Sequence, residues 1–197
     1  MSLTISLTVE QVEERFYQLG IPSGFTPAER EQFATTPVVA PQGSYFGFPT
    51  PADNSALTLY KLRSVLGTDP SHQPAFFDHP WYADEPFMQT PCSAGWHFIL
   101  MDVLPESINQ SYDYARRVKP RGMEVPSAIE VVLMLFLHYG GTQEQLRLRK
   151  HTWCYDRASL ERQVTVGAFG RNGVFLSGHP SGYASRGLGI CAKRHPE

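Results

Sequence analysis

Residues 163–194 read QVTVGAFGRNGVFLSGHPSGYASRGLGICAKR, and this stretch decides the fold of the second half of the chain. Alternating and β-branched residues predict a strand at Val164–Phe169. The sequence Arg171-Asn172-Gly173 suits a hairpin turn, because Asn and Gly tolerate a positive φ. A run rich in Ser, Gly, Tyr and His follows, and the apolar Leu188–Cys191 predicts a closing strand. Short, varied side chains between two strands indicate a display surface rather than a catalytic pocket.

Further short strands are expected around this turn. The predicted antiparallel group comprises Thr152–Tyr155, Val164–Phe169, Gly173–Ser177 and Leu188–Ala192. Gly95–Val103 predicts a separate strand that opens the second half of the chain.

Helices are predicted from capping residues and apolar spacing at Thr8–Leu19, Pro27–Ala34, Leu57–Leu66, Ile108–Val118 with Ser107 as its cap, and Ala128–Tyr139. The last has the strongest signal, because Ser127 and Glu130 form a capping box before AIEVVLMLFLHY. A helix that is apolar on every side is a buried helix.

Residues 68–93 combine prolines with aromatic residues and follow no helical or strand period. Irregular chain is therefore expected here. Burial of its rings should hold it on the core, since each buried ring contributes on the order of 2 kcal/mol. These rings are Phe76, Phe77, Trp81, Tyr82 and Phe87.

The composition fits one globular domain with its own core, because 42% of the 197 residues are hydrophobic. The net charge of −2 gives no overall field that would attract nucleic acid. The basic run Arg147–His151 is interpreted as a solvated face. Nucleic acid is therefore not expected as a partner, and the sequence does not predict an oligomeric state.

Cys92, Cys154 and Cys191 are widely spaced and odd in number, so they form neither a disulfide framework nor a CxxC metal site. The N-terminus shows no secretory signal, and the longest apolar run, Val131–Leu137, is too short to cross a bilayer. A soluble, cytoplasmic protein that does not insert into membranes is therefore expected.

Motifs for catalysis or cofactors are not found. Residue types suited to metals occur, but their spacing matches no known metal motif: His72, Asp78, His79, Asp84, Glu85 and His97. No G-x-S-x-G motif surrounds a serine, and Cys191 fits a small buried thiol in a strand. The glycines of Gly167–Gly173 precede no helix that could bind phosphate. No catalytic residue, metal or cofactor is therefore predicted.

Val174–Arg186 differs in kind from the rest of the chain. Its sequence VFLSGHPSGYASR mixes rings with Ser and Gly, as antibody-like binding surfaces do. An ordinary polar loop with a hairpin is the alternative interpretation. The predicted ligand-binding residues are Phe175, Leu176, Ser177, His179, Ser181, Tyr183, Ser185 and Arg186.

Three segments resemble a C-type-lectin-like domain, in the branch shared by formylglycine-generating-type proteins and the variable proteins of diversity-generating retroelements. GWHFILMD at residues 95–102, with the later Tyr114-Ala115-Arg116, resembles the family's opening strand and first helix. Val125–Glu130 is similar to the start of its second helix, and Arg186–Arg194 is similar to its closing strand.

The resemblance implies an α+β fold: a small twisted antiparallel sheet with two flanking helices, whose first and last strands pair. It divides the chain into a C-type-lectin-like domain at residues 94–197 and a helical, proline- and aromatic-rich N-terminal extension at residues 1–93 that packs on the core. The family's calcium-binding Glu-Pro-Asn and Trp-Asn-Asp signatures and its copper-binding cysteine pair are missing. Calcium-dependent sugar binding and oxidase activity are therefore not implied.

The resemblance also implies a function. A bacterial or phage variable protein of this type binds a macromolecular ligand, here expected to be a protein, through the irregular segment before the last strand. In retroelement variable proteins, adenine-directed mutagenesis does not yield Glu, Lys, Met, Gln or Trp, and Val174–Arg186 contains none of them.

Two other functions remain open. An enzyme could have its pocket between the aromatic loop Phe76–Phe87 and the sheet, with His79, Asp84 or Glu85 as acid–base groups. A structural subunit of a phage-like or secretion assembly is the other alternative.

Overall fold

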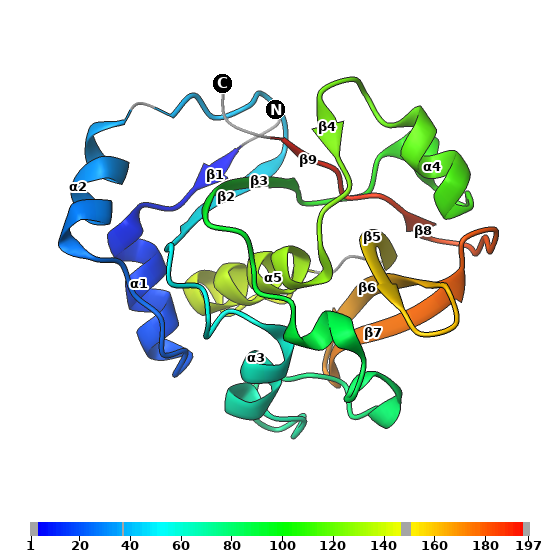
Figure 1. Cartoon of the computed structure of the whole chain (residues 1–197), viewed down its shortest axis with the longest axis horizontal. Helices are drawn as coiled ribbons and strands as arrows, with labels where there is room; N and C mark the ends of the chain where they lie inside the picture. Colours follow the sequence, from blue (N-terminus) through cyan, green and yellow to red (C-terminus); the bar gives the residue numbers. More distant parts are fainter. Residues whose placement is uncertain (1–3, 37, 147–150, 195–197) are drawn as a thin grey trace.

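The computed structural model describes residues 4–36, 38–146 and 151–194, which form a mixed α+β fold with two sheets (Figure 1). The first sheet has the strand order β1-β2-β3-β9-β4, and the second has the order β7-β6-β5-β8. The strands of the first sheet are β1 (Ile5–Ser6), β2 (Tyr45–Thr50), β3 (Gly95–Leu100), β4 (Met123–Glu124) and β9 (Lys193–Arg194). Those of the second are β5 (His151–Ala158), β6 (Arg162–Gly170), β7 (Gly173–Pro180) and β8 (Leu188–Gly189).

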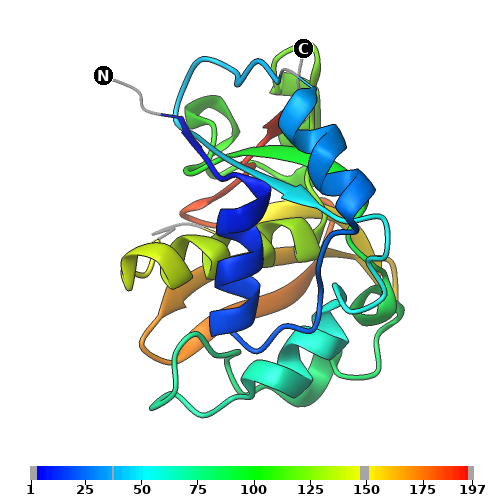
Figure 2. The same ribbon diagram turned by 90° about the vertical axis from the view of Figure 1, so that its left-hand side faces the viewer.

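The helix α5 (Ala128–Thr142) runs between the two sheets and contacts strands of both (Figure 2). The predicted capping box is confirmed: Ser127 accepts a hydrogen bond from the Glu130 amide, and Glu130 accepts one from the Ser127 amide. Every residue from 128 to 138 is buried, as the apolar sequence predicts. The helix continues through both glycines to Thr142 rather than ending at Tyr139.

Described residues of the first ninety-three positions contribute to the same core. The helices α1 (Val9–Gln18) and α2 (Pro27–Thr35) begin at the predicted caps, and α3 (Leu59–Leu66) begins two residues later than predicted. Strands β1 and β2 extend the first sheet, because β2 pairs antiparallel with β3 along its whole length. One hydrophobic cluster contains residues from Leu7 to Cys191.

The aromatic loop is irregular, as predicted, with two short 3₁₀ turns, η1 (Pro80–Tyr82) and η2 (Pro86–Gln89). It closes the outer edge of β7. The Phe77 amide donates to the Val174 carbonyl at 2.9 Å, and the Val174 amide donates to the Ala75 carbonyl at 2.8 Å. The Trp81 indole Nε1 donates to the carbonyl of Leu176 at 3.0 Å. The edge strand therefore exposes fewer unpaired backbone groups.

The predicted helix at Ile108–Val118 is wrong at its start. The helix α4 covers only Tyr112–Val118 and is capped by Ser111. Ser107 instead ends the 3₁₀ turn η3 (Pro105–Ser107), where its buried hydroxyl donates to Leu104 O and accepts from Ile190 N. The hydroxyl of Ser107 is therefore engaged by Leu104 and Ile190 and does not cap α4.

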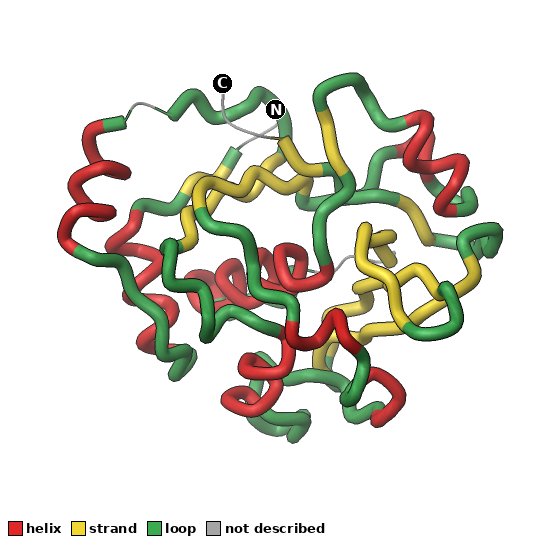
Figure 3. The backbone as a smooth tube through the Cα atoms, viewed as in Figure 1, coloured by secondary structure: helices red, strands yellow, loops and turns green. Residues whose placement is uncertain are grey.

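The predicted closing strand is divided between the sheets. Leu188–Gly189 pairs parallel with β5, whereas Lys193–Arg194 pairs antiparallel with β3 and β4. The second sheet is therefore not purely antiparallel. Figure 3 shows the strands in two groups.

Among the described residues, no helix is long and apolar enough to cross a membrane. Four residues of the predicted basic run, 147–150, lie outside the described residues.

Candidate functional site

The outward face of the second sheet carries predicted ligand-binding residues of β7. Side chains alternate along a strand, and Val174 and Leu176 point into the core with no exposed surface. Phe175, Ser177 and His179 lie on the opposite face, and each is partly exposed. The prediction that Leu176 contacts a ligand is wrong, because its side chain is fully buried in the main hydrophobic cluster.

Three rings from two other segments, the aromatic loop and β5, surround Phe175. Its ring centroid lies 5.2 Å from that of Phe77, 6.0 Å from His151 and 6.4 Å from His79, each close to perpendicular. Gly167 allows His151 to approach the neighbouring strand, since a Cβ at Gly167 would lie 2.6 Å from the His151 Cα. These rings form an ordered and partly exposed platform.

A polar cluster lies farther along β7. The hydroxyls of Thr165 and Ser177 are 2.7 Å apart, and Ser177 Oγ is 3.1 Å from His179 Nε2. The His179 ring stacks on Tyr183, with centroids 4.4 Å apart. Burial lowers the pKa of His179, and the positive charge of Arg162 lowers it further. The neutral imidazole can therefore accept a hydrogen bond from the Ser177 hydroxyl near pH 7.

The loop between β7 and β8 is tied to the segment around α4. Ser181 Oγ donates to Asp113 Oδ2 at 2.9 Å, and the Gly187 amide donates to Asn109 Oδ1 at 2.8 Å. Of the remaining predicted residues on this loop, Tyr183 and Arg186 are exposed and Ser185 is half-buried. The structure thus brings together Phe175, Ser177, His179 and Tyr183 on one face and attaches Ser181 to α4.

Sequence reasoning missed the neighbours that complete this face. They are Phe77, His151, Trp153 and Thr165. A signal was present in β5, where strand alternation places His151 and Trp153 on the face opposite Cys154. Trp153 is fully buried beneath Tyr112 and His179, so it supports the face from below.

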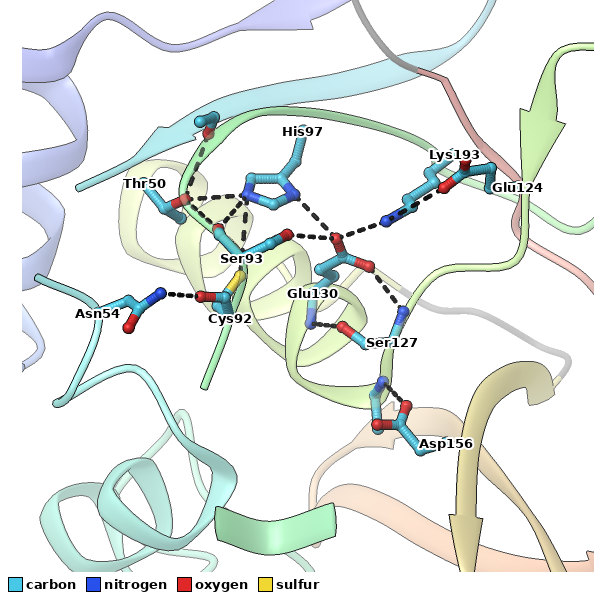
Figure 4. Close-up of polar contacts among 12 residues, drawn as sticks. Thr50, Asn54, Cys92, Ser93, His97, Glu124, Ser127, Glu130, Asp156 and Lys193 are labelled. Atoms are coloured by element: carbon cyan, nitrogen blue, oxygen red, sulfur yellow. Dashed lines mark hydrogen bonds and ion pairs between the residues drawn. The ribbon is translucent and has the colours of Figure 1, made fainter. Parts of the chain in front are cut away.

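A second candidate site lies at the start of α5, where Glu130 is buried between two basic side chains (Figure 4). Glu130 Oε1 accepts from His97 Nδ1 at 3.0 Å and from Lys193 Nζ at 2.9 Å. Its other oxygen accepts from the Ser127 amide at 2.6 Å. These contacts join β3, α5 and β9.

The end of β2 holds the other side of the His97 ring. His97 Nε2 lies 2.9 Å from Thr50 Oγ1 and 3.0 Å from the Ser93 carbonyl oxygen. The Thr50 hydroxyl donates to that same carbonyl at 2.7 Å. The Nδ1 atom of His97 therefore faces the Glu130 carboxylate, and Nε2 faces the Thr50 hydroxyl and the Ser93 carbonyl. Phe48 stacks on the ring at 5.0 Å.

The buried carboxyl stays ionised. Burial alone would raise the pKa of Glu130, but the hydrogen bond and charge of His97, followed by those of Lys193, lower it to about 2. Cys92 Sγ lies 3.8 Å from His97 Nε2, but burial raises the pKa of this thiol well above its usual value. The thiol is therefore not activated as a nucleophile.

A surface cavity of about 290 Å³ opens beside this ion network, lined by Ser93, Ala94, Trp96, His97, Glu130, Lys193 and Arg194. Both Glu130 oxygens accept hydrogen bonds from the protein itself. The network therefore serves first as an anchor that fixes β9 and the 92–95 segment to α5. The sequence held a signal for it, because a carboxylate in an otherwise apolar helix must be buried with partners.

Two of the three residues of the predicted acid–base pocket have structural partners. His79 Nδ1 accepts from the Trp81 amide at 3.3 Å and caps η1. Glu85 Oε2 accepts from both the amide and the hydroxyl of Ser159. Asp84 is exposed.

Metal candidates are likewise dispersed. Within residues 4–36, 38–146 and 151–194, no three His, Cys, Asp or Glu side chains group in a way that could hold a metal ion. His72 pairs with Asp69, and Asp78 pairs with Arg63. The three cysteines are buried, and none of them forms a disulfide within the described residues.

Asp156 next to the ion network should make stability depend on pH. It accepts from the Ala128 amide at 2.6 Å, yet burial raises the pKa of Asp156 to about 6. The folded pKa exceeds the usual 3.8, so ionising Asp156 costs stability above about pH 6, and the cost disappears towards about pH 4. Asp156→Asn should raise the free energy of unfolding at about pH 7.5 by on the order of 2 kcal/mol, with little change near pH 4.

Urea unfolding at several pH values checks this prediction. Glu130 has the opposite sign, since its lowered pKa gives stability that is lost only as the pH falls from about 4.5 towards 2. Asp69→Asn is the matched control, because hydrogen bonds from Ser71 hold the pKa of this exposed carboxyl at about 2. It should give no gain at neutral pH. If the free energy of unfolding of Asp156→Asn depended on pH as that of the wild type does, the raised pKa of Asp156 would be contradicted.

Comparison of the chain with protein-family models, with curated proteins and with solved structures gave no match.

Proposed function

We propose that this chain is a binding protein whose recognition surface is the outward face of β7, with the neighbouring His151 of β5, together with residues 181–186. The observation that carries the proposal is the alternation in β7. Val174 and Leu176 are fully buried, whereas Phe175, Ser177 and His179 face outward. Outward side chains on such a strand can change without disturbing the core beneath them.

The side chains on this face suit protein recognition. Aromatic rings give a large contact area at a low cost in conformational entropy, and hydroxyl groups give adaptable hydrogen bonds. Phe175 and Tyr183 are the proposed anchors, and both are already held by neighbouring rings. Binding to a surface that is ordered in advance loses less entropy. The proposed partner is therefore a protein.

We propose a C-type-lectin-like scaffold for this surface. The pairing of Phe98 with Arg194 supports the proposal, because that family pairs the first and last strands of its domain. The segments that resemble the family form β3, α4, the start of α5, and β8 with β9. A retroelement variable protein is the specific form proposed. Its test is whether the gene lies beside a reverse transcriptase and an adenine-rich near-copy of its own 3′ end.

Partner capture tests the recognition surface. Wild-type chain and the triple variant Phe175→Ala, Tyr183→Ala, Arg186→Ala are immobilised and exposed to the same extract, and bound proteins are quantified by mass spectrometry. The triple variant should capture at least about tenfold less of the specific partner, because anchor residues contribute most of the binding energy of an interface.

The matched control carries Tyr17→Ala, Tyr60→Ala and Arg171→Ala, which remove two exposed aromatics and one exposed arginine elsewhere. This control should retain the partner. Circular dichroism must show that all variants are folded. Equal capture by wild type and the folded face variant would place the recognition surface elsewhere.

A further inference from the structure

A strongly basic segment follows the start of α4. Residues 112–121 read YDYARRVKPR, with four cationic side chains and one carboxylate. The whole chain carries a net charge of −2, so this positive charge is local. Arg116, Arg117 and Arg121 are exposed. We call Arg116, Arg117, Lys119 and Arg121 the basic segment.

Contacts with the backbone and with one carboxylate orient these cations. Arg117 Nε donates to the Asp113 carbonyl at 2.7 Å, and Lys119 Nζ donates to the Met123 carbonyl at 2.6 Å. Arg116 Nε lies 3.5 Å from Asp113 Oδ1. Asp113 is thus shared among its neighbours and neutralises at most one of the four positive charges.

The basic segment adjoins the proposed recognition surface. The carboxylate of Asp113 that lies near Arg116 also accepts from Ser181 of the β7–β8 loop. The Trp153 indole donates to the Gln110 carbonyl at 3.2 Å, just before α4. In Figure 1, α4 lies beside the loop that leads into β8. Arg186, on this loop, adds a further exposed cation.

Resting on the proposed function, we propose that the partner is an acidic protein, whose carboxylates dock on the basic segment and Arg186 while the face of β7 makes the aromatic contacts. Complementary charges at the rim of an interface steer association and fix orientation. Nucleic acid is the less favoured polyanion for three reasons. A carboxylate lies within the patch, the chain as a whole is negative, and the adjoining face has the Tyr, Phe and Ser of a protein-binding surface.

A labelled poly-glutamate peptide is the probe, and fluorescence anisotropy is the readout. The wild-type chain should bind it, and the affinity should fall as NaCl rises from about 0.05 to about 0.3 M. Arg116→Glu with Arg117→Glu should weaken binding at least about tenfold. Arg116→Gln with Arg117→Gln, which removes both charges but keeps polar side chains, should weaken binding by a smaller factor. This variant replaces the charge-reversal variant if the latter does not fold.

The matched control is Lys61→Glu with Arg171→Glu, which reverses the same number of exposed charges on α3 and in the β6–β7 turn. It should bind the peptide as the wild type does. Equal loss in the control, no loss in the α4 variants, or no binding at all would overturn the proposal. Tighter binding of a short DNA duplex than of the peptide would overturn it in favour of nucleic acid. The peptide experiment needs no natural partner and tests the basic segment alone. The capture experiment tests the recognition surface, so either proposal can fail without the other.

Discussion

Glu130→Gln is expected to lower the free energy of unfolding by about 3–5 kcal/mol, the usual cost of removing one member of a buried ion pair. The variant leaves Lys193 buried without its nearest carboxylate. It also turns one acceptor of His97 or Ser127 into an amide donor. Urea unfolding at neutral pH measures the loss, provided that the slope of the transition is unchanged.

The chain offers a matched control for this change. Glu29 occupies the same position in the capping box of α2, but its partners lie at the surface. Glu29→Gln should therefore cost less than about 1 kcal/mol. In the double variant Glu130→Gln with Lys193→Met, the buried charge that lost its nearest partner is also removed, and at least about 1 kcal/mol of the loss should return. Additive losses, or equal effects at Glu29 and Glu130, would contradict the anchor role.

Gly173→Ala is expected to lower the free energy of unfolding by about 3 kcal/mol or more. Gly173 has a φ of +93°, which side chains disfavour. A Cβ there would lie 2.5 Å from the Ala75 carbonyl oxygen and 2.7 Å from the carbonyl carbon of Phe76. Both atoms are backbone, so the chain that closes the edge of β7 would have to move. Denaturant unfolding measures the loss.

Gly182 gives the comparison, because a Cβ added there meets no atom within 4 Å. Gly182→Ala should change stability by less than about 0.5 kcal/mol. It lies on the proposed recognition loop, so the comparison also tests whether that loop accepts new side chains. A similar loss at both glycines would contradict the account of β7 as a strand held by residues 75–77.

Local signals predicted the elements that depend on a few adjacent residues. The capping boxes at Thr26 and Ser127 gave α2 and α5 their starts, and Asn172-Gly173 gave the β6–β7 hairpin. The uniformly apolar sequence of α5 predicted its burial. In each case the deciding interactions span three or four positions, which sequence patterns can register.

Elements that depend on distant partners were missed. Ser107 has the residue type of a helix cap, but its hydroxyl bonds to Ile190, far along the chain. The separation of β8 from β9 follows from which sheet each reaches, and no periodicity encodes that choice. His97 and Lys193 lie 33 and 63 positions from Glu130, so the ion network exists only once β3, α5 and β9 meet.

The candidate surface was predicted only in part, because some of its residues come together only in the folded chain. The composition of Val174–Arg186 identified the segment, but only the alternation of a strand separates Leu176, which is buried, from Phe175 and Ser177. The supporting ring of Phe77 comes from another part of the chain and carried no signal of this role. The ring of His151 was indicated only by the alternation of β5.

Hydroxyl-radical footprinting of the chain with and without its captured partner measures whether the outward face of β7 and residues 181–186 bind that partner. We expect the oxidation of Phe175, His179 and Tyr183 to fall at least about threefold in the complex, because a partner that covers these anchors excludes solvent from them. Tyr17 of α1 and Tyr60 of α3, which are exposed elsewhere, should keep their oxidation rates. Unchanged oxidation of the three anchors, together with protection at Tyr17, Tyr60 or Trp96, would contradict the proposed recognition surface.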